Sequence, residues 1–140
     1  MPNDSAKDIR DRAFSFGCKV ARLALSLAPK PGIRALVDQL LRSGTSIGAN
    51  LEEAKAASTR REFLRDVEVS LREAREAWYW LRIYKELSLG DPLTVVELVN
   101  EADTIIRILT SIVITTKRRM VTIAVVSAFC ILNSALLFSS

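Results

Sequence analysis

Apolar residues recur at intervals of three and four positions in four stretches of this sequence, which is the spacing of one face of an α-helix. Two short breaks interrupt the pattern, APKPG at 28–32 and SLGDP at 88–92. Proline and glycine are costly inside helices, so each break predicts the end of one helix and the start of the next. The predicted helices run from near Ser5 to the first break, from about Ile33 to Ala57, from STRRE to the second break, and from there through Val113.

Residues that cap helices stand at several of these predicted boundaries. Ser5 with Asp8, and Thr59 with Glu62, have the spacing of a capping box, in which two side chains satisfy backbone N–H groups at the start of a helix. The second break contains signals for the end of one helix and the start of the next in consecutive positions. We expect Gly90 to be the C-cap of the third helix, Asp91 the N-cap of the fourth and Pro92 its first residue.

Four amphipathic helices of about 25 residues with short connections favour an all-α fold, an antiparallel up-down-up-down four-helix bundle. The sequence has no strand-like alternation and no internal repeat. The chain has 140 residues, which is enough for one domain with a real hydrophobic core. We therefore assign residues 1–119 to one bundle domain and treat the apolar segment 120–140 separately.

The apolar C-terminal segment, MVTIAVVSAFCILNSALLFSS at 120–140, has no charged residue. About twenty uncharged, mostly apolar residues are long enough to cross a bilayer, although Thr122, Ser127, Asn133 and Ser134 dilute this segment. Basic residues at 117–119 would then keep the bundle in the cytoplasm. The sequence leaves three interpretations open: a membrane anchor, a fifth helix packed on the bundle or its oligomer, and an extension without a selected role.

The composition excludes several kinds of active site. The chain has no histidine, which removes Ser-His-Asp and Cys-His catalytic units and most zinc sites. Its two cysteines, Cys18 and Cys130, form no metal or redox motif and are typical of reduced cytosolic thiols. We therefore expect a cytoplasmic protein with no cofactor, no metal and no enzymatic activity. The formal net charge of +4 is compatible with an anionic partner.

The third predicted helix sorts its charges by sign. In a projection at about 100° per residue, five arginines fall on one arc beside the apolar stripe, and four acidic residues fall on the next arc toward solvent. Three interpretations are open: ordinary i,i+4 pairing of Arg72 with Glu68 and Glu76, a head-to-tail ring of subunits, and a phosphate-binding surface. The arginines are Arg61, Arg65, Arg72, Arg75 and Arg82, and the acidic residues are Glu62, Asp66, Glu73 and Glu76.

An aromatic run, WYWL, follows in the same helix. The projection places Trp78 on the core face and turns Tyr79 and Trp80 away from it. An exposed tryptophan beside arginines can stack on nucleic-acid bases, but Trp and Arg are also enriched at subunit contacts. We favour the subunit contact for Trp80.

The stretch LLRSGTSIGANLEEA, residues 40–54, places weak helix formers in the middle of the second helix. Gly44 and Gly48 project onto its apolar face, where small residues let a neighbouring helix approach closely. A polar stripe lies beside that face, and no catalytic base or phosphate-loop spacing accompanies it. The stripe consists of Ser43, Ser46, Asn50 and Glu53.

Three blocks, LLRSGTSIGANLEEA, STRREFL and VSLREAREAWYWL, resemble the four-helix-bundle proteins encoded in intervening sequences of bacterial 23S rRNA genes. The resemblance covers about residues 8–119 and implies a cytoplasmic homopentamer with a central channel. This family is also similar to the accessory proteins of diversity-generating retroelements, which are basic pentamers that bind nucleic acid and a reverse transcriptase. The family pattern, carried over as bundle and subunit contacts, touches Ser43, Ser46, Ile47, Asn50, Glu53, Phe63, Leu71, Glu73, Glu76 and Trp80.

These observations lead us to expect a non-enzymatic oligomeric bundle that binds RNA or DNA through the five arginines of the third helix. The expected partners are further copies of the chain and nucleic acid, with the ribosome or a reverse transcriptase as the protein context. Two alternatives stay open. One is a protein-interaction scaffold without affinity for nucleic acid, and the other is a tail-anchored membrane protein.

Overall fold

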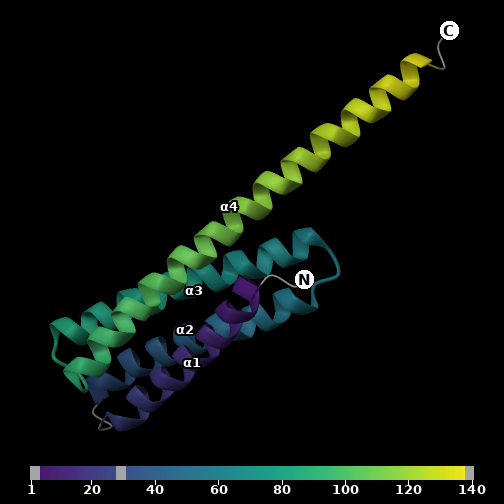
Figure 1. The fold of residues 1–140 in the computed structure, drawn as a ribbon. Helices are drawn as coiled ribbons and strands as arrows, with labels where there is room; N and C mark the ends of the chain where they lie inside the picture. The colour runs from purple at the N-terminus through teal and green to yellow at the C-terminus, as the bar shows by residue number, and fades with distance from the viewer. Residues whose placement is uncertain (1–3, 28–30, 138–140) are drawn as a thin grey trace.

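The computed structural model describes residues 4–27 and 31–137, which form four α-helices arranged as a bundle (Figure 1). The helices are α1 (Asp4–Ser26), α2 (Pro31–Ala56), α3 (Arg60–Glu86) and α4 (Pro92–Leu137). Each helix packs on the next one along the chain, and α1 also packs on α4, which closes the bundle. The predicted all-α four-helix bundle is confirmed.

Two predicted helix starts are confirmed at the level of single hydrogen bonds. The Thr59 hydroxyl accepts from the Glu62 backbone N–H, and the Glu62 carboxylate accepts from the Thr59 N–H, which completes the capping box of α3. At the start of α4, the Thr94 N–H donates to Asp91 Oδ2 over 2.8 Å, and these bonds from Thr94 hold the pKa of Asp91 below its ordinary range. The capping box expected at Ser5 lies outside the side chains that the structure describes.

The predicted C-cap of α3 was wrong. The helix ends at Glu86 with Leu87 as its cap, and Ser88 then adopts a left-handed φ of 54°. The Ser88 N–H donates to the Lys85 carbonyl and the Leu89 N–H to the Tyr84 carbonyl, which is the Schellman pattern. The helix is therefore closed before Gly90 is reached. Gly90, with φ 76°, serves the turn into α4 instead.

Most of the hydrophobic core consists of apolar positions that the helical spacing predicted, but Ala77 and Tyr84 of α3, both fully buried, lie outside the predicted stripe. Four helices contribute one stripe each, and the partly buried Trp78 and Phe63 pack against the outside of the core. Two ion pairs, Arg12 with Glu101 and Lys19 with Glu97, cross from α1 to α4 at the surface. The largest fully buried side chains are Tyr84, Phe16, Leu40, Ile47, Leu81, Leu98, Ile105 and Leu109.

One polar atom in this core is unsatisfied. The Tyr84 hydroxyl is buried without a hydrogen-bond partner among the described residues, and burial raises the pKa of Tyr84 to about 12. Tyr84→Phe removes that hydroxyl, so we expect unchanged stability or a gain of up to about 1 kcal/mol in the free energy of unfolding. Urea denaturation measures the change, with the exposed Tyr79→Phe as control. A loss above about 1 kcal/mol would reveal a hydrogen bond to the Tyr84 hydroxyl.

The glycine-containing stretch of α2 lies against a neighbouring helix, as the sequence predicted, and the structure shows that this helix is α1. A Cβ added at Gly48 would lie 3.6 Å from the backbone of Ala13, and one added at Gly17 would lie 3.6 Å from the Gly44 carbonyl oxygen. At Gly44 an added Cβ would lie only 2.9 Å from Cγ1 of Val20. The two glycines of this stretch are therefore explained by the close approach of the two helices.

The apolar segment 120–140 continues α4 without a break. Up to Thr116 the helix lies on the bundle, and beyond Met120 it extends away from the other three helices as a single rod (Figure 1). All described side chains from Val121 to Ala135 are exposed. The interpretation as a separate fifth helix packed on its own bundle is therefore wrong, because the segment is the outer part of α4. Residues 138–140 lie outside the described part.

Candidate nucleic-acid and subunit interfaces

The five arginines expected on one side of α3 are all exposed. Arg65 pairs with the adjacent Asp66 over 3.0 Å, and the guanidinium of Arg82 lies over the Trp78 ring, 4.4 Å from its centroid. Among the ion pairs of the described residues, none joins a carboxylate to Arg61, Arg72, Arg75 or Arg82. We call Arg61, Arg65, Arg72, Arg75 and Arg82 the arginine arc.

Ordinary pairing along α3 does not account for these charges. Glu68 pairs with Lys117 of α4 over 2.6 Å, and Glu76 pairs with Arg42 of α2. Both carboxylates expected to neutralise Arg72 are thus used by neighbouring helices. The positive charge of the arginine arc is left facing solvent.

The predicted order of the two charged arcs was wrong. The arginines are exposed, whereas the acidic residues are partly buried, with side-chain exposure of 13% at Asp66 and 18% at Glu73. The reason is the contact with α2, which buries Ser70 and Ala77 as well as the predicted apolar stripe. The Ser70 hydroxyl donates to the Ile47 carbonyl oxygen of α2 over 2.9 Å. The acidic arc therefore lies at the α2 seam, and the arginine arc lies outside it.

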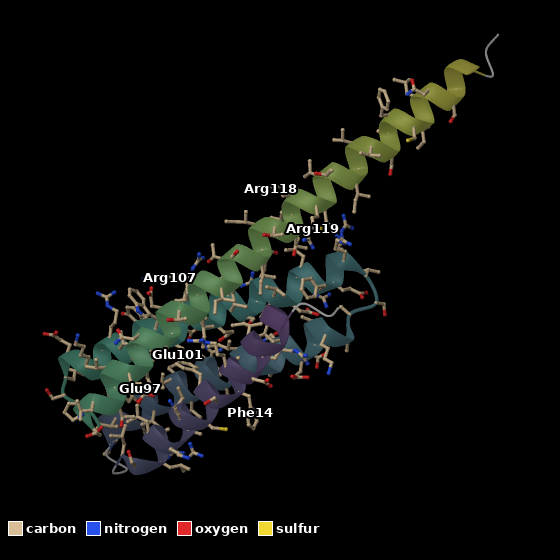
Figure 2. All side chains as sticks on the ribbon, viewed as in Figure 1. Phe14, Glu97, Glu101, Arg107, Arg118 and Arg119 are labelled. Atoms are coloured by element: carbon tan, nitrogen blue, oxygen red, sulfur yellow. The ribbon has the colours of Figure 1, made fainter. Side chains whose placement is uncertain are left out.

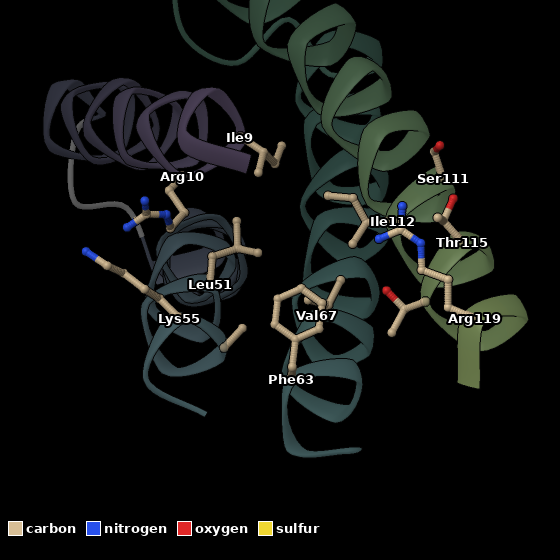
Figure 3. Close-up of a pocket in the computed structure, with 12 residues that line it drawn as sticks. Ile9, Arg10, Leu51, Lys55, Phe63, Val67, Ser111, Ile112, Thr115 and Arg119 are labelled. Carbon is tan, nitrogen blue, oxygen red and sulfur yellow. The ribbon is translucent and has the colours of Figure 1, made fainter. Parts of the chain in front are cut away.

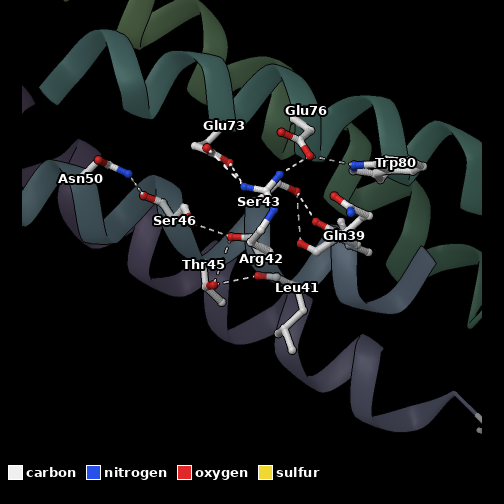
Figure 4. Close-up of polar contacts among 11 residues, drawn as sticks. Gln39, Leu41, Arg42, Ser43, Thr45, Ser46, Asn50, Glu73, Glu76 and Trp80 are labelled. Atoms are coloured by element: carbon white, nitrogen blue, oxygen red, sulfur yellow. Dashed lines mark hydrogen bonds and ion pairs between the residues drawn. The ribbon is translucent and has the colours of Figure 1, made fainter. Parts of the chain in front are cut away.

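Arg42 of α2 is the centre of a polar network at that seam (Figure 4). Its guanidinium donates to Glu73 over 3.1 Å and to Glu76, and the Trp80 indole N–H donates to the same Glu76 carboxylate over 3.3 Å. The bond from Arg42 is the main reason that the pKa of Glu76 is lowered, and the same pair raises the pKa of Arg42. Sequence reasoning singled out the acidic residues but missed Arg42.

The polar stripe of α2 belongs to the same face. The hydroxyls of Ser43 and Ser46 donate to backbone carbonyls four residues earlier, and the Asn50 amide donates to the Ser46 carbonyl oxygen over 2.7 Å. Ser46 and Asn50 keep part of their surface exposed, and Glu53 is exposed. Ser43 has no exposed surface, so its assignment as a subunit contact is wrong: it packs inside its own bundle.

The aromatic run differs in one respect from its predicted arrangement. Tyr79 is exposed as expected, but Trp80 is partly buried and packs against the core. The rings of Tyr79 and Trp80 meet edge to face with centroids 5.1 Å apart. Trp80 is held from two sides, by this ring contact and by its hydrogen bond to Glu76. It therefore belongs to the α2–α3 seam.

The Arg42–Glu76 pair predicts a pH dependence of stability. Because the pKa of Glu76 is lowered in the folded chain, its contribution is complete above the ordinary glutamate pKa of about 4.3 and is lost as the pH falls further. Glu76→Gln is therefore expected to flatten the fall of the urea midpoint between about pH 5 and pH 3. The control is Glu86→Gln, at an exposed carboxylate outside the network. Parallel pH curves for Glu76→Gln and the wild type would contradict the role of this pair.

One end of the bundle holds a cavity of about 400 Å³ between all four helices (Figure 3). Leu51 and Phe63 form part of its apolar wall, and three basic side chains, Arg10, Lys55 and Arg119, line it as well. An adjacent hollow shares Lys55 and Arg119 and adds Arg60. Sequence reasoning missed this site because its basic residues come from four different helices.

Within the part of the chain that the structure describes, no group of three or more His, Cys, Asp or Glu side chains is placed to hold a metal ion. The described surface presents guanidinium groups, carboxylates and apolar side chains. Those groups bind anions, other protein surfaces and lipid.

The fold and its surfaces define an all-α four-helix bundle with an arginine-lined outer face. The sequence profile of the 23S rRNA-intervening sequence protein family matches residues 6–111, and the chain belongs to this family. The family assignment made from the three sequence blocks is thereby confirmed.

A crystal structure with a similar fold is that of a protein of unknown function from the S23 ribosomal protein family of Bacteroides thetaiotaomicron. It has a TM-score of 0.72 and 29% identity, and the match covers 78% of this chain and 97% of that chain. No curated protein matches this chain. The family match ends at residue 111, before the apolar segment 120–140 begins.

Proposed function

We propose that this protein is a non-enzymatic, homo-oligomeric bundle that binds RNA through the arginine arc of α3. One observation carries the proposal. Five arginines are exposed along one side of a single helix, and four of them have no carboxylate partner among the described residues. Such a row of uncompensated guanidinium groups is a surface for phosphates.

The spacing of the arginine arc suits a nucleic-acid backbone. From Arg61 to Arg82 the helix rises about 32 Å at 1.5 Å per residue, which is long enough to follow several consecutive phosphates. Guanidinium groups bind phosphate oxygens in a bidentate manner, and such contacts carry no sequence information. Trp78 lies beneath Arg82 and Trp80 donates a hydrogen bond to Glu76, so both indole rings already have partners within the chain. We infer that binding is tolerant of sequence.

The family context favours RNA over DNA as the ligand. The family is described by its place in a 23S rRNA intervening sequence, and the similar crystal structure is assigned to a ribosomal protein family. We therefore take structured rRNA, in the setting of the ribosome, as the first ligand to test. A reverse transcriptase is the partner suggested by the resemblance to retroelement accessory proteins.

Assembly into a pentamer is part of the same proposal. The α2–α3 seam around Arg42 presents polar side chains with surface left for a neighbouring copy, namely Ser46, Asn50, Glu53, Glu73, Glu76 and Trp80. Each chain has a formal net charge of +4, so a ring of copies multiplies the positive charge available to RNA. The acidic seam and the arginine arc lie on neighbouring sides of α3, which suits head-to-tail contacts between copies.

The salt dependence of binding tests the proposal. The experiment uses residues 1–119. The match to the similar crystal structure covers 97% of that chain but only 78% of this chain, so a bundle without the apolar segment has a folded counterpart of similar size. We expect the logarithm of the affinity for a structured rRNA fragment to fall linearly with the logarithm of salt concentration, with a slope of about −0.9 per neutralised phosphate in duplex regions. Duplex DNA serves as the competitor.

Two results would decide against RNA binding. An affinity that does not change with salt would exclude phosphate contacts as its source. An oligomer that binds no RNA at low salt would be the scaffold instead, and its partners would then be sought among proteins.

A further inference from the structure

The outer part of α4 exposes more apolar surface than a water-soluble helix normally carries. Its described side chains from Val121 to Ala135 are all exposed, and nothing in the bundle covers them (Figure 1). Each large hydrophobic side chain in this part is between 53% and 71% exposed. They are Val121, Ile123, Val125, Val126, Phe129, Ile131 and Leu132.

These side chains surround the helix instead of forming one stripe. At about 100° per residue, their directions leave no gap wider than about 80°. A helix that packs on one partner helix has an apolar seam on one side, whereas a helix that is apolar on all sides is buried on all sides or lies in lipid. The pattern therefore favours a lipid environment over a single second copy of the segment.

Two of the polar residues in the segment are satisfied within the helix itself. The Thr122 hydroxyl donates to the Arg118 carbonyl oxygen over 3.0 Å, and the Ser134 hydroxyl donates to the Cys130 carbonyl oxygen over 2.9 Å. Hydroxyls bonded in this way need no water, so they are tolerated in hydrocarbon. Thr122 and Ser134 are thus compatible with a membrane.

The length of the segment fits a bilayer. The helical part, residues 120–137, is about 27 Å long, and the whole charge-free run of 120–140 would span about 31 Å as a helix. The hydrocarbon core of a typical bilayer is about 30 Å thick. α4 as a whole also meets the length and composition expected of a membrane-crossing helix, and its most apolar part is not buried.

The end of the bundle from which this segment extends is basic. Arg118 and Arg119 lie where α4 leaves the other helices (Figure 2), and neither has a carboxylate partner in the described part of the chain. Lys55 and Arg60, also exposed, lie beside Arg119 around the adjoining hollows. Basic residues at the edge of an apolar helix favour the anionic cytoplasmic face of a membrane.

We propose that residues 120–137 insert into a lipid bilayer and that the basic end of the bundle, formed by Lys55, Arg60, Arg118 and Arg119, lies on its anionic headgroups. This proposal does not rest on RNA binding, because neither residues 120–137 nor the four residues of the basic end belong to the arginine arc, although Arg61 of the arc directly follows Arg60. Both activities can occur together, with the bundle held on the cytoplasmic surface.

Flotation of the full chain with lipid vesicles tests the proposal. We expect the chain to float with vesicles of phosphatidylcholine and phosphatidylglycerol and to stay bound in about 1 M salt, where screening removes surface electrostatics. Val126→Arg with Phe129→Arg places two charges in the middle of the segment and is expected to lower the floated fraction at least tenfold. Leu25→Arg with Leu93→Arg, at exposed apolar positions of the bundle, makes the same change in charge and is expected to have no effect.

The basic end has a separate readout. Arg118→Gln with Arg119→Gln is expected to weaken binding to anionic vesicles by about tenfold or more, with little change for neutral vesicles. Equal losses for both kinds of vesicle would overturn the contact with anionic headgroups.

Cys130 reports on insertion directly. In a Cys18→Ser background it is the only thiol of the chain, and it lies exposed in the middle of the segment. We expect vesicles to slow its reaction with a membrane-impermeant maleimide at least tenfold. Release of the chain by high salt, flotation of the double-arginine variant, or equal protection of Cys130 without lipid would overturn insertion. The last result would mean that copies of the segment cover one another.

Discussion

Replacement of Arg72 and Arg75 together by glutamate is expected to weaken binding of structured rRNA by about 25- to 60-fold at about 0.1 M salt. Each lost phosphate contact makes the slope of log affinity against log salt concentration less steep by about 0.7 to 0.9. Two lost contacts therefore change log affinity by about 1.4 to 1.8 between about 1 M and about 0.1 M salt, which gives this factor. Neither arginine has a carboxylate partner among the described residues, so the substitutions break no ion pair of the bundle. Fluorescence anisotropy of a labelled rRNA fragment measures the dissociation constant over a salt series.

The matched control is Arg22→Glu with Arg34→Glu. These arginines are exposed on α1 and α2, away from the arginine arc, and their replacement changes the net charge by the same amount. We expect this control to retain most of the affinity and nearly all of the salt slope. Equal losses in the two double variants would mean that RNA senses only the net charge, and the arginine arc would then have no special role.

Gly44→Ala is expected to leave the bundle less stable than Gly48→Ala by about 1 to 3 kcal/mol in the free energy of unfolding. Both substitutions gain helix propensity of about 1 kcal/mol, so the comparison isolates packing. A Cβ at residue 44 would lie 2.9 Å from Cγ1 of the fully buried, β-branched Val20, which cannot turn away. At residue 48 the nearest atoms are at 3.6 Å, an ordinary contact.

Urea denaturation of both variants, at one pH and one salt concentration, makes this comparison. Gly32→Ala is the control, because an added Cβ there meets nothing within 4 Å. Gly44→Ala and Gly48→Ala with equal midpoints would contradict the close approach of α1 and α2. They would also remove our explanation for the two glycines in the middle of α2.

The helices and most of the core were predictable from the sequence because apolar periodicity records which face of each helix is buried. Phe16, Ile47 and Leu98 all lie where the spacing placed them. The end of α3 was not predictable in the same way. A left-handed residue is usually glycine, but here Ser88 takes that position, and Gly90 is used two residues later.

The charged surfaces were predictable only in part. The projection separated arginines from acidic residues, but it could not set the centre of the buried face. That centre depends on Ser70 and Ala77, small residues that carry little hydrophobic signal and are buried because α2 packs closely over them. Arg42 was missed for a related reason, since its acidic partners lie more than thirty residues away on another helix.

The sequence alone identified the apolar segment 120–140, but it did not show that this segment continues α4. Residues 117–119 are basic and suggest the end of a domain, yet α4 passes through them without a break. A helix continues wherever its residues allow the backbone geometry, and charged residues such as these are good helix formers. The charge pattern marks the limit of burial and not the end of the helix.

The solution mass of residues 1–119 is the most direct test of an oligomeric, RNA-binding bundle. Light scattering measures this mass with and without a structured rRNA fragment, at low and at moderate salt. We expect a pentamer whose mass rises with RNA at low salt and returns to the protein value at moderate salt. A monomer whose mass does not change with RNA at either salt concentration would contradict both the assembly and the function proposed for the arginine arc.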